Sequence, residues 1–464
     1  MRTLHLFLLA ALLILCTGRS FAQWVQVGSG MGQVWEVVVD PTNEQVIYAG
    51  SNTTGVWKTT NGGASWAQIN TGLSSLVVQA LAISRTNTDI LYCGTANGLF
   101  LTADAGGSWF TINTGITEAT VAVQAIAIDP TTPEIAYVAI FNGTANATNG
   151  IYKTTDNGLT WAPAANGIGT VKNFLCFAIN PLNPKVIYAG SSFAQPVTTD
   201  QARIYKSTNS AASWFDVSNG IPATQGATTH DPVRKLSIQA ADTNRVLAGI
   251  FLNDSLGGMY LTTNGGTSWQ KRHTGLATTA PGTLPRSVLI RPGTTNEFYC
   301  GIGTEIGVFQ TTDAGLSWTS FNNGALTNPA TIRSLAYAPT SRYLYAGGAH
   351  ASDATLQGVF RTQLAPVSVH EIPPGLPADF VLYQNYPNPF NPSTKIAYDL
   401  PERGFVTLKV YNVLGQKVAT LVEGEVSPGY HEANFDATGL TSGMYFYRLH
   451  AGTFSQTKRL MLMK

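Results

Sequence analysis

An eight-residue pattern occurs six times, and its spacing restricts the possible folds of this chain more than any other feature does. The copies are TTNGGASW (59–66), TADAGGSW (102–109), TTDNGLTW (154–161), STNSAASW (207–214), TTNGGTSW (262–269) and TTDAGLSW (311–318). Their tryptophans, at 66, 109, 161, 214, 269 and 318, are 43, 52, 53, 55 and 49 residues apart. A repeat of roughly 40–50 residues is typical of the four-stranded blades of a β-propeller.

Each repeat has the same order of apolar runs. In the first, runs at 37–41, 46–50 and 55–58 precede the octet, and a short run at 66–69 follows it. We therefore expect four antiparallel strands per repeat, called A, B, C and D, with the octet forming the turn between C and D. The predicted fold class is all-β.

The octet has the chemistry of a tight hairpin turn. Its Asp or Asn accepts backbone N–H bonds across the turn, its Gly takes a positive φ angle, and its Trp covers the turn. We expect structural roles for Asn61, Trp66, Asp104, Trp109, Asp156, Trp161, Asn209, Trp214, Asn264, Trp269, Asp313 and Trp318. A catalytic carboxylate or a sugar-stacking Trp is the less favoured interpretation. Ala211 stands where Gly is expected, which predicts a distorted turn in the fourth copy.

A segment near the N-terminus is expected to complete the last blade. Segments 332–337, 343–347 and 358–362 supply strands A, B and C, but no Trp follows them. Residues 24–31 (WVQVGSGM) parallel residues 66–73 (WAQINTGL) and can supply the missing strand D. Closure of this kind removes exposed strand edges. The sequence thus predicts seven blades.

The octet resembles the Asp box of BNR-type repeats, Ser/Thr-x-Asp/Asn-x-Gly-x-x-Trp, over residues 24–365. Propellers with this repeat include sialidases, xyloglucan-hydrolysing glycosidases, the sortilin ectodomain and photosystem II assembly factors. The chain resembles both sortilin-like propellers and the assembly factors, and a single seven-bladed propeller most resembles the assembly factors. The resemblance implies a fold, and a fold alone does not assign a function.

A candidate ligand site emerges when the A strands are aligned. One position per blade is expected near the mouth of the central channel: Trp35, Gln79, Gln124, Leu175, Arg234, Arg286 and Arg333. Three neighbouring blades carry Arg there, and nearby loops add Arg203, His230 and His350. Converging guanidinium groups can bind a carboxylate, sulfate or phosphate. Alternatively, each Arg packs between blades and pairs locally with Glu305, Asp231 or a backbone carbonyl.

Long connections are expected on the face where strands B and C, and strands D and A, are joined. They are 141–150, 191–203, 251–258, 348–358, 219–232 and 274–285. Long variable loops gathered on one face of a rigid scaffold are typical of a binding surface.

A polysaccharide hydrolase is the enzyme alternative. Hydrolysis of a glycoside uses two carboxylates at a defined separation. Loop candidates are Asp200, Asp231, Asp254, Glu305 and Asp353, and their sequence context singles out no pair. We find no Arg-Ile-Pro segment of the sialidase kind and no motif that predicts a cofactor or metal site. The net charge of +1 gives no general attraction for nucleic acid.

The N-terminus reads as a secretory signal peptide. Arg2 precedes an apolar run at 4–15, and Ser20-Phe21-Ala22 supplies the small residues of a cleavage site after Ala22. Cleavage leaves three cysteines, Cys93, Cys176 and Cys300, each in an apolar run. We expect buried free thiols rather than a disulfide or a metal site.

The C-terminal segment follows a Pro-rich linker, 365–378, and reads as a small antiparallel sandwich. It contains YPNPFNPST, VYNVLGQKV, GMYFYRL and a basic end at 458–464. These motifs resemble the type A sorting domain of the type IX secretion system, found in Gram-negative bacteria. The sorting motif is Tyr386, Pro387, Asn388, Pro389, Phe390, Asn391 and Pro392. A carbohydrate-binding sandwich is the alternative.

The sorting resemblance implies a route and a partner. Such a domain is read by an outer-membrane translocon after export to the periplasm. It is then usually cleaved, and the cargo is released or fixed to surface lipopolysaccharide. The expected domains are the signal peptide (1–22), the propeller (23–364), the linker (365–378) and the sorting domain (379–464).

The sequence therefore predicts a secreted or surface-displayed propeller that binds a glycan or a protein without catalysis. The alternatives are a polysaccharide hydrolase and an assembly or adhesion scaffold for a protein partner.

Overall fold

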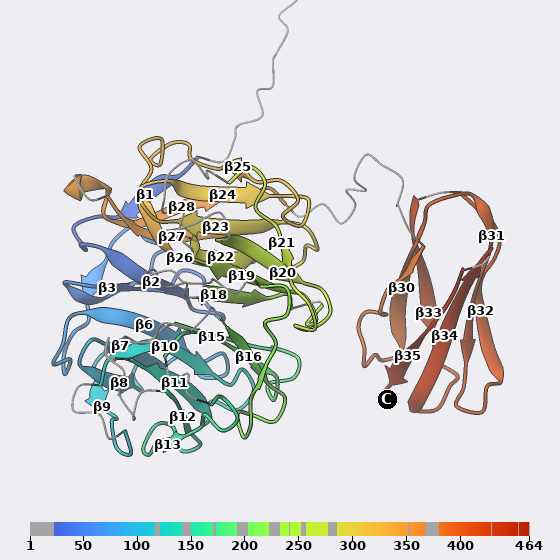
Figure 1. Cartoon of the computed structure of the whole chain (residues 1–464), viewed down its shortest axis with the longest axis horizontal. Coiled ribbons are helices and arrows are strands. Elements are labelled where there is room, and N and C mark those ends of the chain that lie inside the picture. Colours follow the sequence, from blue (N-terminus) through green and yellow to red (C-terminus); the bar gives the residue numbers. More distant parts are fainter. Residues whose placement is uncertain are drawn as a thin grey trace, which may run out of the picture. The chain divides into compact units, whose positions relative to one another are not determined.

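The computed structural model describes residues 23–116, 121–141, 150–169, 173–192, 203–221, 233–240, 242–251, 257–276, 285–350, 353–366, 380–427, 429–452 and 454–463. The chain divides into two compact units, Met1–Val367 and Ser368–Lys464 (Figure 1). Both units consist of β-strands, with one 3₁₀ turn, η1 (Ala354–Leu356). The all-β expectation is confirmed. In the described part of the chain, no helix is long and apolar enough to cross a membrane.

The first unit contains seven four-stranded antiparallel sheets. Their A strands are β2 (Val34–Val39), β6 (Val78–Ile83), β10 (Val123–Ile128), β14 (Phe174–Ile179), β18 (Val233–Ile238), β22 (Pro285–Ile290) and β26 (Thr331–Ala338). Their B strands are β3 (Ile47–Ser51), β7 (Leu91–Thr95), β11 (Ala136–Ile140), β15 (Ile187–Ser191), β19 (Val246–Ile250), β23 (Phe298–Ile302) and β27 (Tyr343–Ala349).

The C and D strands complete the sheets. The C strands are β4 (Gly55–Thr59), β8 (Gly98–Thr102), β12 (Gly150–Thr154), β16 (Ile204–Ser207), β20 (Gly258–Thr262), β24 (Gly307–Thr311) and β28 (Gly358–Gln363). The D strands are β5 (Ala67–Gln68), β9 (Phe110–Thr111), β13 (Ala162–Pro163), β17 (Phe215–Asp216), β21 (Gln270–Lys271), β25 (Thr319–Ser320) and β1 (Val25–Gly28).

The A strands form the inner ring of a β-propeller. Each contacts the A strand of the next sheet, in the order β2, β6, β10, β14, β18, β22 and β26, and β26 contacts β2 again. Close approach between sheets depends on glycine in strand B. A Cβ on Gly50 would lie 2.6 Å from Val78 Cγ1 of the next sheet, and one on Gly347 would lie 2.8 Å from Val34 Cγ1.

The N-terminal segment closes this ring. Strand β1 pairs antiparallel with β28, so residues at the two ends of the propeller share one sheet. Trp24 is 1% exposed, and its carbonyl accepts a hydrogen bond of 2.8 Å from Ala325 N. The segment therefore occupies the place of the missing strand D.

The tryptophans link successive sheets by one repeated hydrogen bond. Each indole Nε1 donates to a backbone carbonyl in the D strand of the preceding sheet or just after it. The pairs are Trp66–Val27, Trp109–Ile69, Trp161–Ile112, Trp214–Ala164, Trp269–Val217, Trp318–Arg272 and Trp24–Phe321, at 2.6–2.8 Å. Burial of the ring and satisfaction of its N–H occur together, as is usual for Trp in a protein interior.

The octets form the expected turns. Asp104 Oδ1 accepts hydrogen bonds from Thr102 Oγ1 at 2.6 Å and Ser108 N at 3.0 Å. Asn61 Oδ1 makes the same two contacts, with Thr59 Oγ1 and Ser65 N. The fourth turn differs from the prediction, because Ala211 adopts φ +64° and its N–H still bonds Ser207 Oγ at 2.9 Å, so the turn keeps the pattern of the others.

Three cysteines of the propeller are buried and free. Cys93, Cys176 and Cys300 are 0–2% exposed, and burial raises the pKa of each thiol. In the described residues they are packing side chains, as expected.

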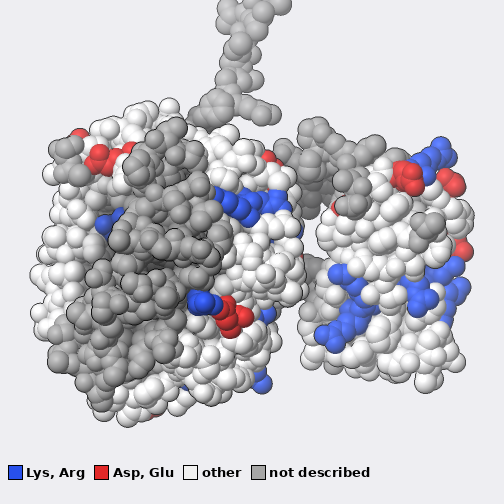
Figure 2. Space-filling view, viewed as in Figure 1, with Lys and Arg blue, Asp and Glu red and all other residues white. Residues whose placement is uncertain are grey.

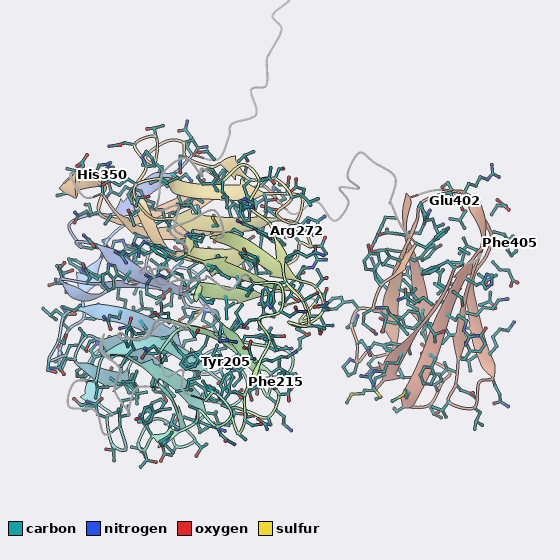
Figure 3. The ribbon with its side chains drawn as sticks, in the orientation of Figure 1. Tyr205, Phe215, Arg272, His350, Glu402 and Phe405 are labelled. Atoms are coloured by element: carbon teal, nitrogen blue, oxygen red, sulfur yellow. The ribbon has the colours of Figure 1, made fainter. Side chains whose placement is uncertain are left out.

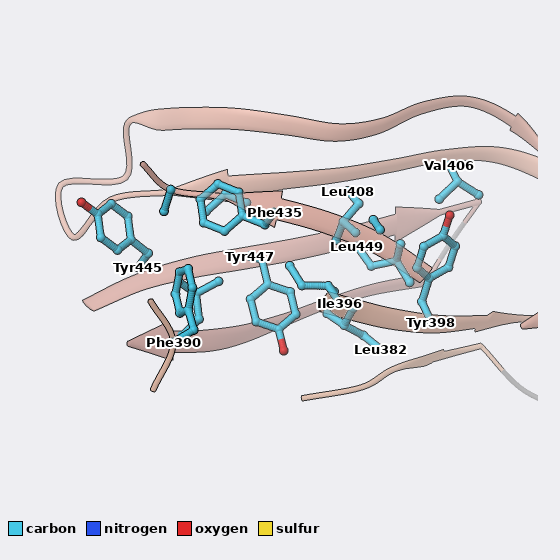
Figure 4. Close-up of a cluster of buried hydrophobic side chains, with 14 of the residues drawn as sticks. Leu382, Phe390, Ile396, Tyr398, Val406, Leu408, Phe435, Tyr445, Tyr447 and Leu449 are labelled. Carbon is cyan, nitrogen blue, oxygen red and sulfur yellow. The ribbon is translucent and has the colours of Figure 1, made fainter. Parts of the chain in front are cut away.

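The second unit is a sandwich of two sheets. One sheet contains β29 (Val381–Leu382), β30 (Ser393–Leu400) and β33 (Gly429–Asp436). The other, in the order β32-β31-β34-β35, contains β32 (Lys417–Val426), β31 (Gly404–Tyr411), β34 (Gly443–Ala451) and β35 (Phe454–Leu462). Inward side chains such as Phe390, Tyr447 and Leu449 form one core between the sheets (Figure 4). The peptide bonds before Pro387, Pro389 and Pro392 are cis.

Candidate functional site

One residue in every A strand forms a β-bulge. The pairing register between strands A and B shifts at that residue in all seven sheets. The bulged positions are Trp35, Gln79, Gln124, Leu175, Arg234, Arg286 and Arg333, the same positions that the sequence alignment of A strands selects. A bulge leaves its residue unpaired in the ladder and re-aims its side chain. Each of the seven A strands therefore contributes one such side chain to the inner ring.

Three of these side chains form a cluster of positive charge. Burial and the charge of Arg286 lower the pKa of Arg234 to about 10. Burial and the charges of Arg286 and Arg234 lower the pKa of Arg333 to about 10. Burial also lowers the pKa of Arg286. The charge of Arg286 thus lowers the pKa of both other arginines, and the three side chains occupy equivalent positions on the adjacent strands β18, β22 and β26, where like charges repel one another.

The same three side chains have unsatisfied hydrogen-bonding groups. In the described part of the chain, the Nε atoms of Arg234, Arg286 and Arg333 are buried and have no hydrogen-bond partner. Aromatic rings support two of them: Arg333 Cζ lies 4.5 Å from the ring centroid of Trp35, and Arg234 Cζ lies 5.4 Å from that of Phe251. A guanidinium group stacked on an aromatic face keeps its in-plane donors available.

The other side of the ring is neutral. Gln124 Nε2 donates to Gln79 Oε1 at 3.2 Å and to the carbonyl of Phe141 at 3.1 Å. Leu175 separates this amide pair from Arg234. The positive charge is thus confined to three adjacent sheets.

An ion pair crosses the ring next to the bulged positions. Lys235 Nζ lies 2.9 Å from Glu36 Oε2, joining β18 to β2. Glu36 Oε1 also accepts a hydrogen bond of 2.7 Å from Ser334 Oγ. Because Glu36 already pairs with Lys235 and Ser334, its charge is not available to neutralise the arginines. The sequence alone did not predict this pair, although aligned A strands place Glu36 and Lys235 at the same position with opposite charge.

The structure separates Arg203 from the cluster. Arg203 forms an ion pair with Asp216, and both side chains are 36% exposed. With Lys206, Phe215 and Asn264, among others, they line a groove of about 580 Å³ between β17 and the octet of the next sheet. Ligand binding by Arg203 stays a prediction, and it would occur in this groove rather than beside Arg234.

Of the two histidines in the predicted site, His350 belongs to the described part of the chain and His230 does not. His350 follows β27 and is 7% exposed, and its Nδ1 lies 3.3 Å from Glu305 Oε1 (Figure 3). His230 lies outside the described residues, as do Asp231 and most of the long connections that the sequence assigns to the binding face.

The described carboxylates of the enzyme alternative have structural partners. Glu305 pairs with His350. Asp353 caps η1, its Oδ1 accepting a hydrogen bond of 2.9 Å from Thr355 N. Asp200, Asp231 and Asp254 lie outside the described residues.

Solved structures with a similar fold are β-propellers. A glycoside hydrolase family 74 xyloglucanase from Xanthomonas campestris is 14% identical with a TM-score of 0.53, over 82% of this chain. The match covers 59% of that enzyme, so this chain spans less than two thirds of its length. YCF48 bound to D1 peptide is 13% identical with a TM-score of 0.52, over 76% of this chain and 98% of that one.

A second YCF48 structure, from Cyanidioschyzon merolae, is 12% identical with a TM-score of 0.50, over 74% of this chain and 99% of that one. Identities this low show the fold and leave the activity open. None of the curated proteins compared with the chain matches it in sequence.

The C-terminal unit has a family match. Residues 384–463 match the family described as secretion system C-terminal sorting domain. The match contains the Tyr386–Pro392 motif and strands β30 to β35. Residues 384–463 are therefore a sorting domain of the type IX secretion system, which directs this β-propeller protein to the cell surface or outside the cell.

Proposed function

We propose that the propeller is a non-catalytic module that binds an anionic group of a protein or a glycan through Arg234, Arg286 and Arg333. The observation that carries the proposal is the cluster itself. Three like charges repel one another, and each has a buried Nε without a partner among the described residues. Such an arrangement destabilises a free protein, and locally unfavourable arrangements tend to occur at functional sites.

The chemistry of the cluster supports a carboxylate, sulfate or phosphate as the bound group. Guanidinium groups donate paired, in-plane hydrogen bonds that match these oxygen acids. An anion placed among the three side chains would accept hydrogen bonds from their terminal guanidinium nitrogens and offset the repulsion between their charges. The pair of Lys235 and Glu36 is neutral in sum, so the local excess of positive charge comes from the arginines.

A protein or peptide ligand has one additional support. One propeller of similar fold has been solved with a peptide bound. The similarity to that structure concerns the fold, so it favours a peptide as the first ligand class to test and does not select it over an acidic glycan.

The hydrolase alternative is supported by the fold similarity to a xyloglucanase. Against it, Glu305 and Asp353 have structural partners in the described residues. Release of reducing sugar from xyloglucan by the mature chain, abolished in Glu305→Gln or Asp353→Asn, would establish the enzyme instead.

The site of action is expected to be outside the cell. We infer that the signal peptide is cleaved after Ala22 and that the sorting domain is read by the type IX translocon. The mature propeller is then released or fixed at the surface.

The test is a screen of the mature chain, residues 23–464, against arrays of acidic peptides and of neutral and acidic glycans. The expected result is binding to anionic members that is lost in Arg286→Gln and kept in Arg85→Gln, a matched change at an exposed position. Equal binding by both variants, or binding restricted to neutral glycans, would contradict the proposal.

A further inference from the structure

The family motifs of the sorting domain meet at one end of its sandwich. Tyr411, the last residue of β31, pairs with Phe446 near the start of β34. Met444 pairs with Met461 near the end of β35, and Phe390 of the Tyr386–Pro392 motif bridges to Leu462. Segments that are separate in the sequence thus form one surface.

Apolar side chains are exposed at this end. Val413 is 66% exposed, Leu414 79%, Met463 57% and Met444 37%. We call these four residues and Met461 the apolar tip. Since Tyr411 pairs with Phe446, the turn that carries Val413 and Leu414 leaves the sheet where β34 begins and β35 ends. Exposed apolar side chains gathered in one place mark interaction surfaces more often than scattered ones do.

The turn of the apolar tip is held in one conformation. Asn412 Oδ1 accepts hydrogen bonds from Leu414 N at 3.0 Å and from Gln416 N at 2.9 Å. Gly415 takes φ +76°, and its N–H bonds the carbonyl of Asn412 at 3.0 Å. A turn fixed in this way presents its two aliphatic side chains without a large loss of entropy on binding.

Positive charges border the apolar tip. The strand register places Lys417, Tyr411, Phe446 and Arg459 in one row across the outer face of the sheet. Arg448 Cζ lies 5.7 Å from the ring centroid of Tyr411. Figure 2 shows Lys and Arg side chains in a band across the sorting domain, and acidic side chains beside further basic ones at its upper end.

The border charges lack acidic partners. Among the described residues, Lys417, Arg448 and Arg459 form no ion pair, whereas Lys409 pairs with Glu423 and Arg403 pairs with Glu425 further along the same sheet. The core explains the inward residues of these strands, such as Tyr445 and Leu460. It does not explain why the outward residues are apolar at the tip and basic around it.

We propose that the apolar tip and its basic border are the surface through which a protein of the export machinery binds this sorting domain. The matching surface on that protein is an apolar pocket with an acidic rim. Tyr, Met and Arg are enriched at protein interfaces, and Met adapts to pockets of different shape. Sorting requires a receptor that distinguishes this chain from other exported proteins, which attachment to an anionic lipid surface would not do.

The test uses the full chain in a bacterium that has a type IX secretion system. Val413→Ser with Leu414→Ser removes two exposed apolar groups, and Lys417→Glu with Arg459→Glu reverses the border charge. Phe405→Ser is the matched control, because Phe405 is 54% exposed on β31 at the opposite end of the sandwich (Figure 3). The exported fraction is measured by immunoblot of the medium, the cell surface and the periplasm.

Both paired variants should reduce the exported fraction about tenfold or more, because each removes side chains at the centre of the proposed interface. Phe405→Ser should be exported normally. Unchanged thermal unfolding of the purified variants shows that the fold is kept. Normal export of either paired variant would overturn the proposal.

Two further measurements identify what binds the apolar tip. Co-sedimentation of the chain with lipopolysaccharide and phospholipid vesicles, lost in the same variants, would identify a lipid surface and overturn the proposal of a protein. A dimer in analytical ultracentrifugation that the same variants dissociate would identify a second copy of the chain instead. Retention in the periplasm without either result supports a protein receptor.

Discussion

Lys235 and Glu36 join opposite sides of the propeller through a 2.9 Å contact between Nζ and Oε2. They are 199 residues apart in the sequence and belong to β18 and β2, which are separated by β22 and β26 on one side of the ring and by β6, β10 and β14 on the other. Burial lowers the pKa of Lys235, but the charge of Glu36 and the hydrogen bond between the two side chains leave that pKa raised. The pair therefore connects two sheets that are not neighbours in the ring.

Replacing Lys235 by Met should destabilise the propeller. Glu36, whose side chain is 16% exposed, would keep the hydrogen bond from Ser334 but lose Lys235, and breaking this partly buried pair should cost about 1–2 kcal/mol. Arg203→Met, which breaks the half-exposed pair with Asp216, should cost less than about 1 kcal/mol. Urea unfolding at neutral pH measures both, and equal effects of the two changes would show that the Lys235 pair has no special place in the fold.

The N-terminal closure predicts that two distant tryptophans are equivalent. Trp24 and Trp161 are 1% and 3% exposed, and each indole donates to the carbonyl of the preceding sheet at 2.8 Å. Trp24→Ala should therefore cost about as much free energy of unfolding as Trp161→Ala, roughly 3–5 kcal/mol. Deleting residues 24–31 should destabilise further, because it exposes the edge of β28. A thermal unfolding curve of Trp24→Ala that matches the parent chain would show that the ring closes without this segment.

The octets with Asp and with Asn should differ in acid sensitivity. Hydrogen bonds from Thr102 and Ser108 lower the pKa of Asp104 to about 2, and those from Thr160 and Thr154 lower that of Asp156 to about 2. The ordinary value is 3.8, so these carboxylates bind fewer protons in the folded state than in the unfolded one. Their stabilisation is complete above about pH 4 and is lost as the pH falls toward 2.

Asn61 makes the equivalent turn without a titrating group. Asp104→Asn with Asp156→Asn should therefore leave stability at pH 7 nearly unchanged and reduce its loss between pH 4 and pH 2. Unfolding midpoints in urea across this range provide the measurement. A double variant that loses stability as steeply as the parent would assign acid sensitivity to other groups.

Close packing between sheets predicts that an added methyl group is harmful in strand B. A Cβ at position 50 would meet Val78 Cγ1 at 2.6 Å. Gly50→Ala should cost about 1–3 kcal/mol through overpacking. Adding Val78→Ala makes room, so the double variant should lose less than the sum of the two single changes. If the losses in free energy of unfolding were additive in chemical denaturation, the contact between positions 50 and 78 would not be the source of the strain.

The repeat made much of this architecture predictable. Six octets fix the C–D turns, and the likeness between 24–31 and 66–73 located the closing strand, now seen as the pairing of β1 with β28. The sorting domain was recognisable because its motifs supply core positions such as Phe390.

Other features depend on contacts between distant parts of the chain, so the local sequence does not predict them. The bulge at Arg286 is a property of how β22 pairs with β23, and the residue itself does not encode it. Proximity of Glu36 to Lys235 follows only from the closed ring. The octet pattern also predicted a distorted turn at Ala211. Ser210 and Ala211 instead take φ +58° and +64°, which is tolerated where the surrounding hydrogen bonds hold the backbone.

Thermal unfolding of the mature chain in sulfate, compared with chloride at equal ionic strength, tests the arginine site most directly. An anion bound among Arg234, Arg286 and Arg333 stabilises the folded state by mass action, so sulfate should raise Tm of the parent. Arg286→Gln should start from a higher Tm in chloride, because it relieves the repulsion, and should gain little from sulfate. A sulfate-induced rise in Tm of the same size in both proteins would contradict the account.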